Sequence, residues 1–210
     1  AFSKSCNTYF ADKSLIIGKD SLGKMADNFM LNTNIPFDLS VKESKFDYKG
    51  DLGKTKIASS AYGQGDVLVT PLNMALMVSA IANEGKMVKP LFVKDVFDKN
   101  NSIVKNYRTE VLSESVSPHI AESIKEMMRE TVKTGTGRNA GLKNVQVSGK
   151  TGTAQNASDN SHGWFVGFAP YDNPQIAVAI IVEEGGATGG EIAAPIARDI
   201  ISYAINNINF

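Results

Sequence analysis

The pattern of hydrophobic and polar residues gives helix signals in four places along the chain, and the first two lie within the first 30 residues. The segment "NTYFADKSLIIG" predicts a helix that Gly18 ends, because glycine readily adopts the left-handed conformation of a helix C-terminus. Asp20 is then expected to cap a second, short helix that runs to Phe29. From there to Thr70 the chain is polar and weakly patterned, and we expect loops that cross the surface.

Two further helices begin with a hydroxyl residue followed by proline, which is a typical helix start. In "TPLNMALMVSAIANEG", Thr70 is the expected N-cap, Pro71 the first helical residue and Gly85 the stop. Its predicted apolar face consists of Met74, Met77, Val78 and Ile81. In "SPHIAESIKEMMRETV", which starts at Ser117, the predicted apolar face consists of Ile120, Ile124, Met127 and Met128.

The apolar period changes to two after residue 145, which predicts strands in "VQVSGKTGTA", "GWFVGFAP" and "QIAVAIIVEE". The turn residues "PYDNP" predict an antiparallel hairpin between the last two. After "GGATGGE" a closing helix is expected, with Pro195 in its first turn and Ile196, Ile200, Tyr203 and Ala204 on its apolar face. Helices, then three strands, then a helix indicate an α+β fold in which helices cover an antiparallel sheet.

The composition narrows the functional classes. With 42% hydrophobic and 21% charged residues the chain is an ordinary globular one, and its formal net charge of zero gives no surface for nucleic acid. Because Cys6 is the single cysteine and no Cys/His cluster occurs, we expect neither a metal nor another cofactor. The longest apolar run, residues 176–182, is too short to span a bilayer, so any membrane anchor is expected outside these residues.

The stretch "VSGKTGTAQN" admits a phosphate-binding loop or a substrate-binding strand. A phosphate-binding loop requires GxxxxGK[ST] followed by a helix, but Asn144 replaces the first glycine and a polar loop follows. On a strand, Lys150 and Gly152 share one face, and Thr151 and Thr153 share the other. A substrate with a free carboxylate can then dock along the edge as an added strand. The alternative is a plain surface lysine in a glycine-rich strand.

A second short motif, Ser5-Cys6-Asn7, precedes the first helix. Serine or asparagine at such a position is commonly just a helix cap. The pair S-x-N and K-T-G in this order is more specific, because it matches two of the three motifs of penicillin-binding proteins and class A β-lactamases.

With these motifs, the chain resembles the C-terminal part of the transpeptidase domain of class B penicillin-binding proteins. The likeness includes "SCNTYFA", "AYGQGDVLVTPLNMALMVSAIANEGKMVKP", "VSGKTGTAQ" and "GWFVGFAP". The resemblance implies a penicilloyl-serine transferase, β-lactamase-like fold that is incomplete at its N-terminus. It also implies D,D-transpeptidase activity on the D-Ala-D-Ala stem peptides of peptidoglycan, and covalent binding of β-lactams.

The resemblance assigns a role to each motif residue. Ser5 and Lys150 are expected to be catalytic, with Ser5 relaying a proton and Lys150 holding the proton network. Asn7 is expected to contact a substrate amide. Thr151, Gly152 and Thr153 are expected to bind the substrate, the threonines at its carboxylate, with the Thr153 amide forming half of the oxyanion hole.

The family's nucleophilic motif, S-x-x-K, precedes S-x-N in the family but has no match before Ser5. Two later matches, "SLGK" at residues 21–24 and "SIVK" at residues 102–105, fall in the wrong order. We therefore expect residues 1–210 to be the C-terminal part of the domain, without the nucleophile and inactive alone.

Two alternatives share the same motifs. One is a β-lactam sensor or catalytically dead binding domain. The other is a serine β-lactamase. Class A enzymes need a deacylating glutamate between S-x-N and K-T-G, and the glutamates in this interval are Glu43, Glu84, Glu110 and Glu114. For the transpeptidase, the resemblance implies a place at the extracytoplasmic face of the bacterial plasma membrane and other cell-wall synthesis proteins as partners.

Overall fold

The computed structural model describes residues 1–157 and 159–208. Its elements are η1 (Phe2–Lys4), α1 (Asn7–Ile17), α2 (Lys19–Asn28), α3 (Lys54–Ser60), α4 (Pro71–Ala82), β1 (Lys86–Val88), β2 (Asp95–Phe97), β3 (Ile103–Asn106), β4 (Val111–Glu114), α5 (Pro118–Lys133), η2 (Arg138–Ala140), β5 (Ser148–Ala154), β6 (His162–Ala169), β7 (Ile176–Val182) and α6 (Gly189–Asn207). Across these described ranges, no helix has the length and apolar character needed to cross a membrane.

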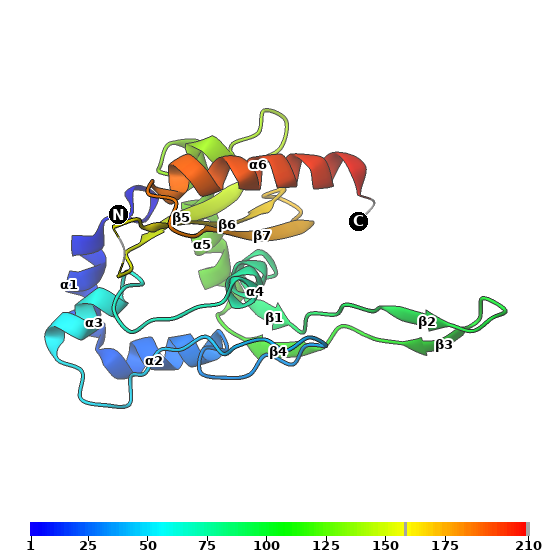
Figure 1. Cartoon of the computed structure of the whole chain (residues 1–210), viewed down its shortest axis with the longest axis horizontal. Helices are drawn as coiled ribbons and strands as arrows, with labels where there is room; N and C mark the ends of the chain where they lie inside the picture. The colour runs from blue at the N-terminus through cyan, green and yellow to red at the C-terminus, as the bar shows by residue number, and fades with distance from the viewer. Residues whose placement is uncertain (158, 209–210) are drawn as a thin grey trace.

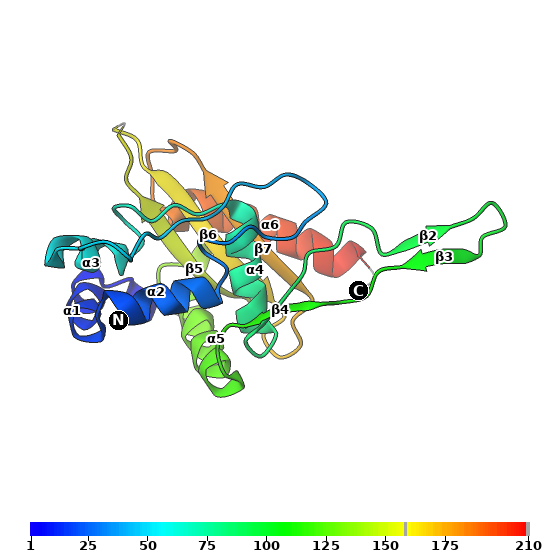
Figure 2. The same cartoon turned by 90° about the horizontal axis from the view of Figure 1, so that it is seen from below.

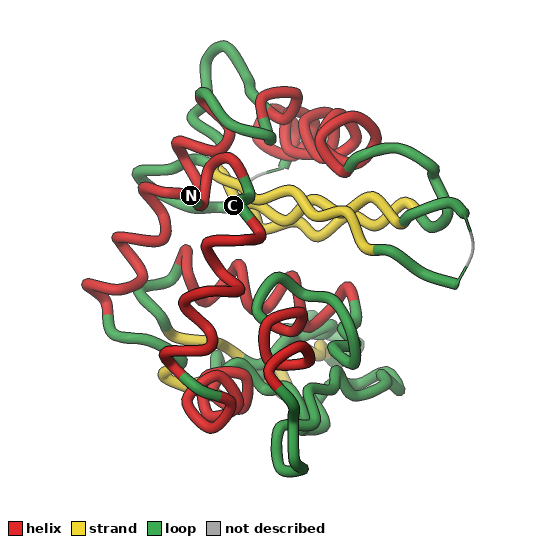
Figure 3. The backbone as a smooth tube through the Cα atoms, turned by 90° about the vertical axis from the view of Figure 1, so that its left-hand side faces the viewer, coloured by secondary structure: helices red, strands yellow, loops and turns green. Residues whose placement is uncertain are grey.

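The central sheet is antiparallel and has the strand order β5-β6-β7. Helix α6 covers one face of it, and α4 and α5 lie on the other side (Figure 1). An end-on view shows the same layering, with the strands between α6 and most of the other helices (Figure 3). The predicted α+β architecture and the antiparallel hairpin are confirmed.

The sheet separates two hydrophobic cores because successive side chains of β6 point to opposite faces. On the α4 side, fully buried Phe168 packs with Val78 and Ile81 of α4. On the α6 side, fully buried Phe165 packs against small residues of α6, among them Ala193 and Ala197. Each core therefore depends on one phenylalanine of the middle strand.

The first two helices confirm most of the prediction. Helix α1 ends at Ile17, and Gly18 follows with φ 80°, a conformation that suits glycine. Gly18 is also the N-cap of α2, so Asp20 lies within the first turn of α2 and does not cap it. The predicted cap was wrong because α2 starts directly after the left-handed glycine, one residue before Asp20.

Both predicted hydroxyl caps are confirmed. The Thr70 hydroxyl accepts a hydrogen bond from the Asn73 amide at 3.2 Å, and the Ser117 hydroxyl accepts one from the Ile120 amide at 3.4 Å. The predicted apolar face of α4 was too narrow, because this helix is covered on several sides and also buries Leu76 and Ala80.

The apolar faces predicted for the two longest helices were partly wrong. In α5, Met128 is buried, but Ile120 and Met127 are exposed. In α6, Ile196, Ile200 and Tyr203 are exposed, whereas Ala204 is buried as predicted. The buried face of α6 instead consists of Gly189, Gly190, Ala193, Ala194, Ala197, Ile201 and Ala204. Close packing on the sheet selects these small residues over the bulkier stripe.

Pro195 was expected in the first turn of the closing helix, but α6 starts at Gly189 and the proline lies inside it. Proline has no amide hydrogen, so the helix lacks one internal hydrogen bond at this point. The capping box of Thr188 and Glu191 stabilises the start of α6 one turn earlier.

The segment expected to consist of surface loops contains more structure than predicted. Helix α3 lies within it, and Leu31 and Phe46 are buried. The Asn32 side chain accepts from the Phe46 amide at 2.9 Å and donates to the Phe46 carbonyl at 3.0 Å. One polar side chain thus satisfies a backbone that forms no regular strand, which hydropathy patterning does not detect.

Two small antiparallel pairs lie outside the central sheet, β1 with β4 and β2 with β3. The β2–β3 hairpin projects away from the body (Figures 1 and 2). Strands β1, β2 and β4 were not predicted, because a strand of three or four residues is too short to show a period-two pattern.

The start of α6 approaches the sheet so closely that only glycine fits. A Cβ atom at Gly189 would lie 2.0 Å from the Trp164 carbonyl oxygen and 2.3 Å from the Gly152 carbonyl oxygen. We expect Gly189→Ala to lower the free energy of unfolding by about 2 kcal/mol or more, since neither backbone can move freely. Gly50→Ala, where a Cβ meets nothing within 4 Å, is the control and should be neutral in urea unfolding.

Candidate active site

The S-x-N motif lies on a tight turn between η1 and α1. The Ser5 amide donates to the Phe2 carbonyl at 3.0 Å, and the Cys6 amide donates to the Ala1 carbonyl at 3.1 Å. Ser5 adopts a left-handed conformation with φ 52°, which is uncommon for a residue other than glycine and is frequent at functional sites. Asn7 is the first residue of α1.

Strand β5 is the free edge of the central sheet, and it carries the K-T-G motif. Lys150 pairs with Val166 and Thr151 with Phe165, so the two side chains point to opposite faces. This confirms the alternation predicted for the strand. Lys150 lies on the α4 face of the sheet, and Thr151 on the α6 face.

The two motifs meet directly across a groove. The Lys150 amine donates hydrogen bonds to the Ser5 hydroxyl at 2.9 Å and to the Thr151 carbonyl at 2.7 Å. The same amine lies 5.8 Å from the centre of the Phe2 ring. Residues 145 positions apart are thereby brought into contact.

Burial lowers the pKa of Lys150 from its ordinary value of 10.5 to about 8. The pocket residues that the structure describes include no aspartate or glutamate to compensate the charge. At neutral pH the amine remains mostly protonated, so it presents an uncompensated positive charge to the groove. Such a site favours an anionic ligand.

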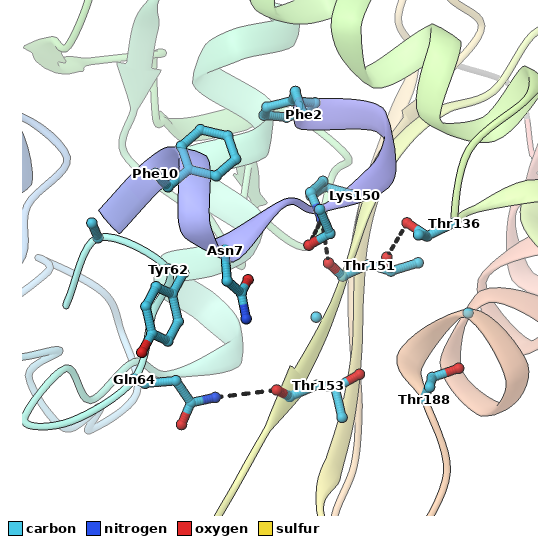
Figure 4. A pocket seen from close by; sticks show the side chains of 14 residues that line it. Phe2, Asn7, Phe10, Tyr62, Gln64, Thr136, Lys150, Thr151, Thr153 and Thr188 are labelled. Atoms are coloured by element: carbon cyan, nitrogen blue, oxygen red, sulfur yellow. Dashed lines mark hydrogen bonds between the residues drawn. The ribbon is translucent and has the colours of Figure 1, made fainter. Parts of the chain in front are cut away.

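The groove is a pocket of about 550 Å³ (Figure 4). Its wall on the motif side comes from η1 and α1, the opposite wall from the loop after α3, and its floor from β5 and the start of α6. The lining residues are Phe2, Ser5, Asn7, Phe10, Ala61, Tyr62, Gln64, Thr136, Lys150, Thr151, Gly152, Thr153, Thr188 and Gly190. All six residues predicted from the sequence are among them.

The edge of β5 is held by contacts from both sides. The Gln64 side-chain amide donates to the Thr153 carbonyl at 3.1 Å (Figure 4). The Gly189 amide donates to the Thr153 hydroxyl at 3.5 Å. The Thr151 hydroxyl is hydrogen-bonded to the Thr136 hydroxyl. The carbonyl of Thr153 therefore points away from β6 toward the pocket, and its amide points to the same side of the strand.

Sequence reasoning missed several lining residues, notably Tyr62, Gln64, Thr136 and Thr188. For Gln64 the sequence did hold a signal, the flanking glycines Gly63 and Gly65. These glycines adopt φ values of 77° and 70° and so expose the glutamine on a tight loop. Thr136 and Thr188 carry no local signal, since threonine in a turn is ordinary and only the fold brings them to β5.

The alternative interpretations of these motifs do not fit this geometry. Strand β5 is followed by a polar loop and another strand, so it is no phosphate-binding loop. Residues 21–24 lie in α2 and residues 102–105 at β3, and neither match to S-x-x-K lines the pocket. Within the described chain, no group of three or more His, Cys, Asp or Glu side chains is arranged to hold a metal.

Comparison with known proteins identifies the family. Residues 1–202 match the family model described as the penicillin binding protein transpeptidase domain. The chain belongs to this family. The predicted membership in the class B penicillin-binding proteins is confirmed, and so is the predicted penicilloyl-serine transferase fold.

Several relatives support this assignment. Peptidoglycan D,D-transpeptidase PbpA of Mycolicibacterium smegmatis is 38% identical over 98% of this chain. Stage V sporulation protein D of Bacillus subtilis is 33% identical over 94% of it. Among solved structures, the ceftriaxone acyl-enzyme complex of penicillin-binding protein A from M. tuberculosis superposes with a TM-score of 0.91 at 33% identity, over 98% of this chain and 47% of that one.

The chain spans less than half the length of these curated relatives, 43% of the first and 32% of the second. The chain also matches a solved D,D-transpeptidase domain from Eggerthella lenta, with a TM-score of 0.88 and 29% identity. This match covers 100% of this chain and 53% of that domain's chain.

Replacing Lys150 tests the burial of its charge. The difference between 10.5 and about 8 corresponds to about 3 kcal/mol by which folding disfavours the charged amine. Because the unfolded chain binds more protons between these two values, stability rises with pH across this window. The cost of burying the charged Lys150 amine is therefore complete below about pH 8 and absent above pH 10.5.

We therefore expect Lys150→Met to raise the free energy of unfolding at pH 7 by about 1–3 kcal/mol, after allowance for the lost hydrogen bonds. The gain should shrink as the pH rises from about 8 to 10.5. Urea unfolding at several pH values measures it, with exposed Lys143→Met as the control. A destabilised variant at pH 7 would show that the amine contributes net stability.

Proposed function

We propose that this chain is the substrate-recognising C-terminal part of a serine D,D-transpeptidase. In the intact protein it cross-links peptidoglycan stem peptides that end in D-Ala-D-Ala, and it is acylated by β-lactams. The observation that carries the proposal is the 2.9 Å hydrogen bond from Lys150 to Ser5 at the free edge of β5. The names of the relatives and the β-lactam acyl-enzyme complexes of solved relatives support it.

The edge of β5 suits a peptide with a terminal carboxylate. The peptide adds to the sheet as an extended strand, and the lack of a side chain at Gly152 lets it lie against the backbone. The Lys150 ammonium attracts the carboxylate, and the hydroxyls of Thr151 and Thr153 donate to it. These four groups are all part of the pocket lining.

The proton-transfer role belongs to Ser5 and Lys150. As the leaving amine departs, the Ser5 hydroxyl passes it a proton and takes up in exchange the proton that the attacking serine releases. The Lys150 amine keeps Ser5 oriented by the hydrogen bond already formed. Asn7 contacts the amide of the donor peptide. The amide of Thr153 points to the pocket side of β5 and supplies one donor for the oxyanion.

The acylated serine is proposed to lie in a segment outside these 210 residues. None of the described lining residues belongs to an S-x-x-K sequence, although the groove has the other parts of the site. By this proposal the intact protein works at the extracytoplasmic face of the bacterial envelope with other cell-wall synthesis proteins, and its anchor lies in the remaining chain.

The pocket gives less support to a β-lactamase. In class A β-lactamases, a glutamate near the ester is needed to hydrolyse the acyl-enzyme. Glu43, Glu84, Glu110 and Glu114 are all absent from the described lining. A slowly hydrolysed acyl-enzyme, typical of a transpeptidase, is therefore expected with β-lactams.

Fluorescent penicillin tests where the nucleophile lies. We expect the intact protein to form a covalent adduct and the isolated 210-residue chain to form none, because the attacking hydroxyl is elsewhere. Gel fluorescence and peptide mapping of the adduct provide the measurement. A labelled residue within the isolated chain would refute the proposed position of the nucleophile.

Replacing Ser5 tests the proton relay. Ser5→Ala should lower the acylation rate of the intact protein by about 10²–10⁴-fold, the usual contribution of a general acid–base group. Ser3→Ala is the matched control, because Ser3 contacts the Thr136 amide through its backbone carbonyl, which alanine retains. Stopped-flow acylation with a chromogenic cephalosporin measures both, and a Ser5 variant within threefold of the wild type would rule the relay out.

A further inference from the structure

The turn between α5 and η2, residues 134–137, contacts both halves of the groove. On one side it binds the segment that leads to Ser5: the Thr136 amide donates to the Ser3 carbonyl at 3.1 Å, and the Lys4 amine donates to the Thr134 carbonyl at 2.8 Å. On the other side its Thr136 hydroxyl is hydrogen-bonded to the Thr151 hydroxyl of β5 (Figure 4). One residue thus contacts both motif-bearing segments.

The turn is closely fitted to the Ser5 segment. A Cβ atom at Gly135 would lie 2.2 Å from the Ser3 carbonyl oxygen and 2.8 Å from the Thr131 carbonyl oxygen. Ser5, two residues after Ser3, adopts a left-handed conformation with φ 52°. Backbone of this kind persists only where surrounding contacts hold it, and the turn supplies such contacts.

The hydroxyl pair has a consequence for the ligand. Each hydroxyl has one hydrogen to donate, so only one of the two donates within the pair. If Thr136 donates to Thr151, the Thr151 hydrogen is free to point into the pocket, and its polarity is increased by the bond it accepts. The opposite orientation uses up the Thr151 hydrogen and leaves no donor there for a carboxylate.

We propose that Thr136 is a positioning residue that orients the Thr151 hydroxyl to donate to the substrate carboxylate. The proposal rests on the proposed function and deepens it, because it assigns to the same pocket a residue outside the S-x-N and K-T-G motifs. Thr136 acts through Thr151 and not on the reacting atoms. Removing its hydroxyl should therefore weaken recognition of the carboxylate and leave the remaining chemistry intact.

The test compares acylation of the intact protein by a penicillin with acylation by the methyl ester of the same penicillin. Thr136→Val keeps the shape of the side chain and removes the hydroxyl. We expect it to lower the second-order rate constant for the penicillin by about 10–100-fold, the usual effect of losing a hydrogen bond to a charged group. The rate constant for the methyl ester should stay within about twofold, and Thr136→Ser should restore the penicillin rate to within about threefold.

Thr134→Val is the matched control, because the Thr134 hydroxyl is hydrogen-bonded to Glu130 on α5 and the variant keeps the backbone contact to Lys4. It should leave both rate constants unchanged. An equal loss with the penicillin and its ester, a failure of Thr136→Ser to restore the rate, or no loss at all would overturn the proposal. Thr136→Ala, which should reproduce the loss, replaces the valine variant if that variant does not fold.

A neutron structure of the wild-type protein separates this inference from the proposed function, because it locates the hydrogen in the hydroxyl pair. If the wild-type intact protein is not acylated, the proposed function fails, and the neutron structure alone decides the inference. A hydrogen on the Thr136 hydroxyl that points to the Thr151 oxygen supports positioning by Thr136. A hydrogen on the Thr151 hydroxyl that points to the Thr136 oxygen overturns it.

Discussion

The hydrogen bond from the Lys150 amine to the Ser5 hydroxyl is the contact on which the site depends. It joins the edge of the central sheet to the turn before α1, and all other lining residues are arranged around it. Because the amine is largely desolvated and has no carboxylate partner in the described pocket, its charge is available to a ligand. The same burial disfavours folding, so recognition of an anion is obtained at the expense of stability.

Close backbone packing brings the walls of the pocket together. Helix α6 begins with two glycines over β5 and β6, and its buried face is lined mainly by alanine. Small residues allow the helix start, with Thr188 and Gly190, to reach the groove. On the opposite side, the turn at residues 134–137 holds the backbone of Ser3 and the side chain of Lys4. The width of the groove is therefore set by backbone contacts, which are less compliant than side-chain contacts.

The membership in the penicillin-binding transpeptidase family and the local chemistry agree. The family assignment rests on a match over residues 1–202, whereas the roles proposed for individual residues rest on the contacts around Lys150, Thr151 and Thr153. In the proposed function, the motifs supply the reacting and binding groups. Residues outside them, such as Gln64 and Thr136, contact the motif strand and hold its edge in place.

Local patterns in the sequence were enough to predict the features that depend on local physics. Gly18 and the hydroxyl caps Thr70 and Ser117 set helix ends, period-two patterning set the three main strands, and strand alternation placed Lys150 opposite Thr151. The motifs Ser5-Cys6-Asn7 and Lys150-Thr151-Gly152 were readable because their residue types and order are distinctive.

The packing of distant segments determines which face of each helix is buried, how the segment around Phe46 is held, and which further residues join the site. In α6 two stripes have helical spacing, and the close approach to the sheet, not hydropathy, selects the alanines over Ile196 and Ile200. Thr136 reaches Thr151 through a turn 15 residues away, and Gln64 reaches Thr153 over 89 residues. Contacts of this kind depend on the packing of distant segments, which no local pattern encodes.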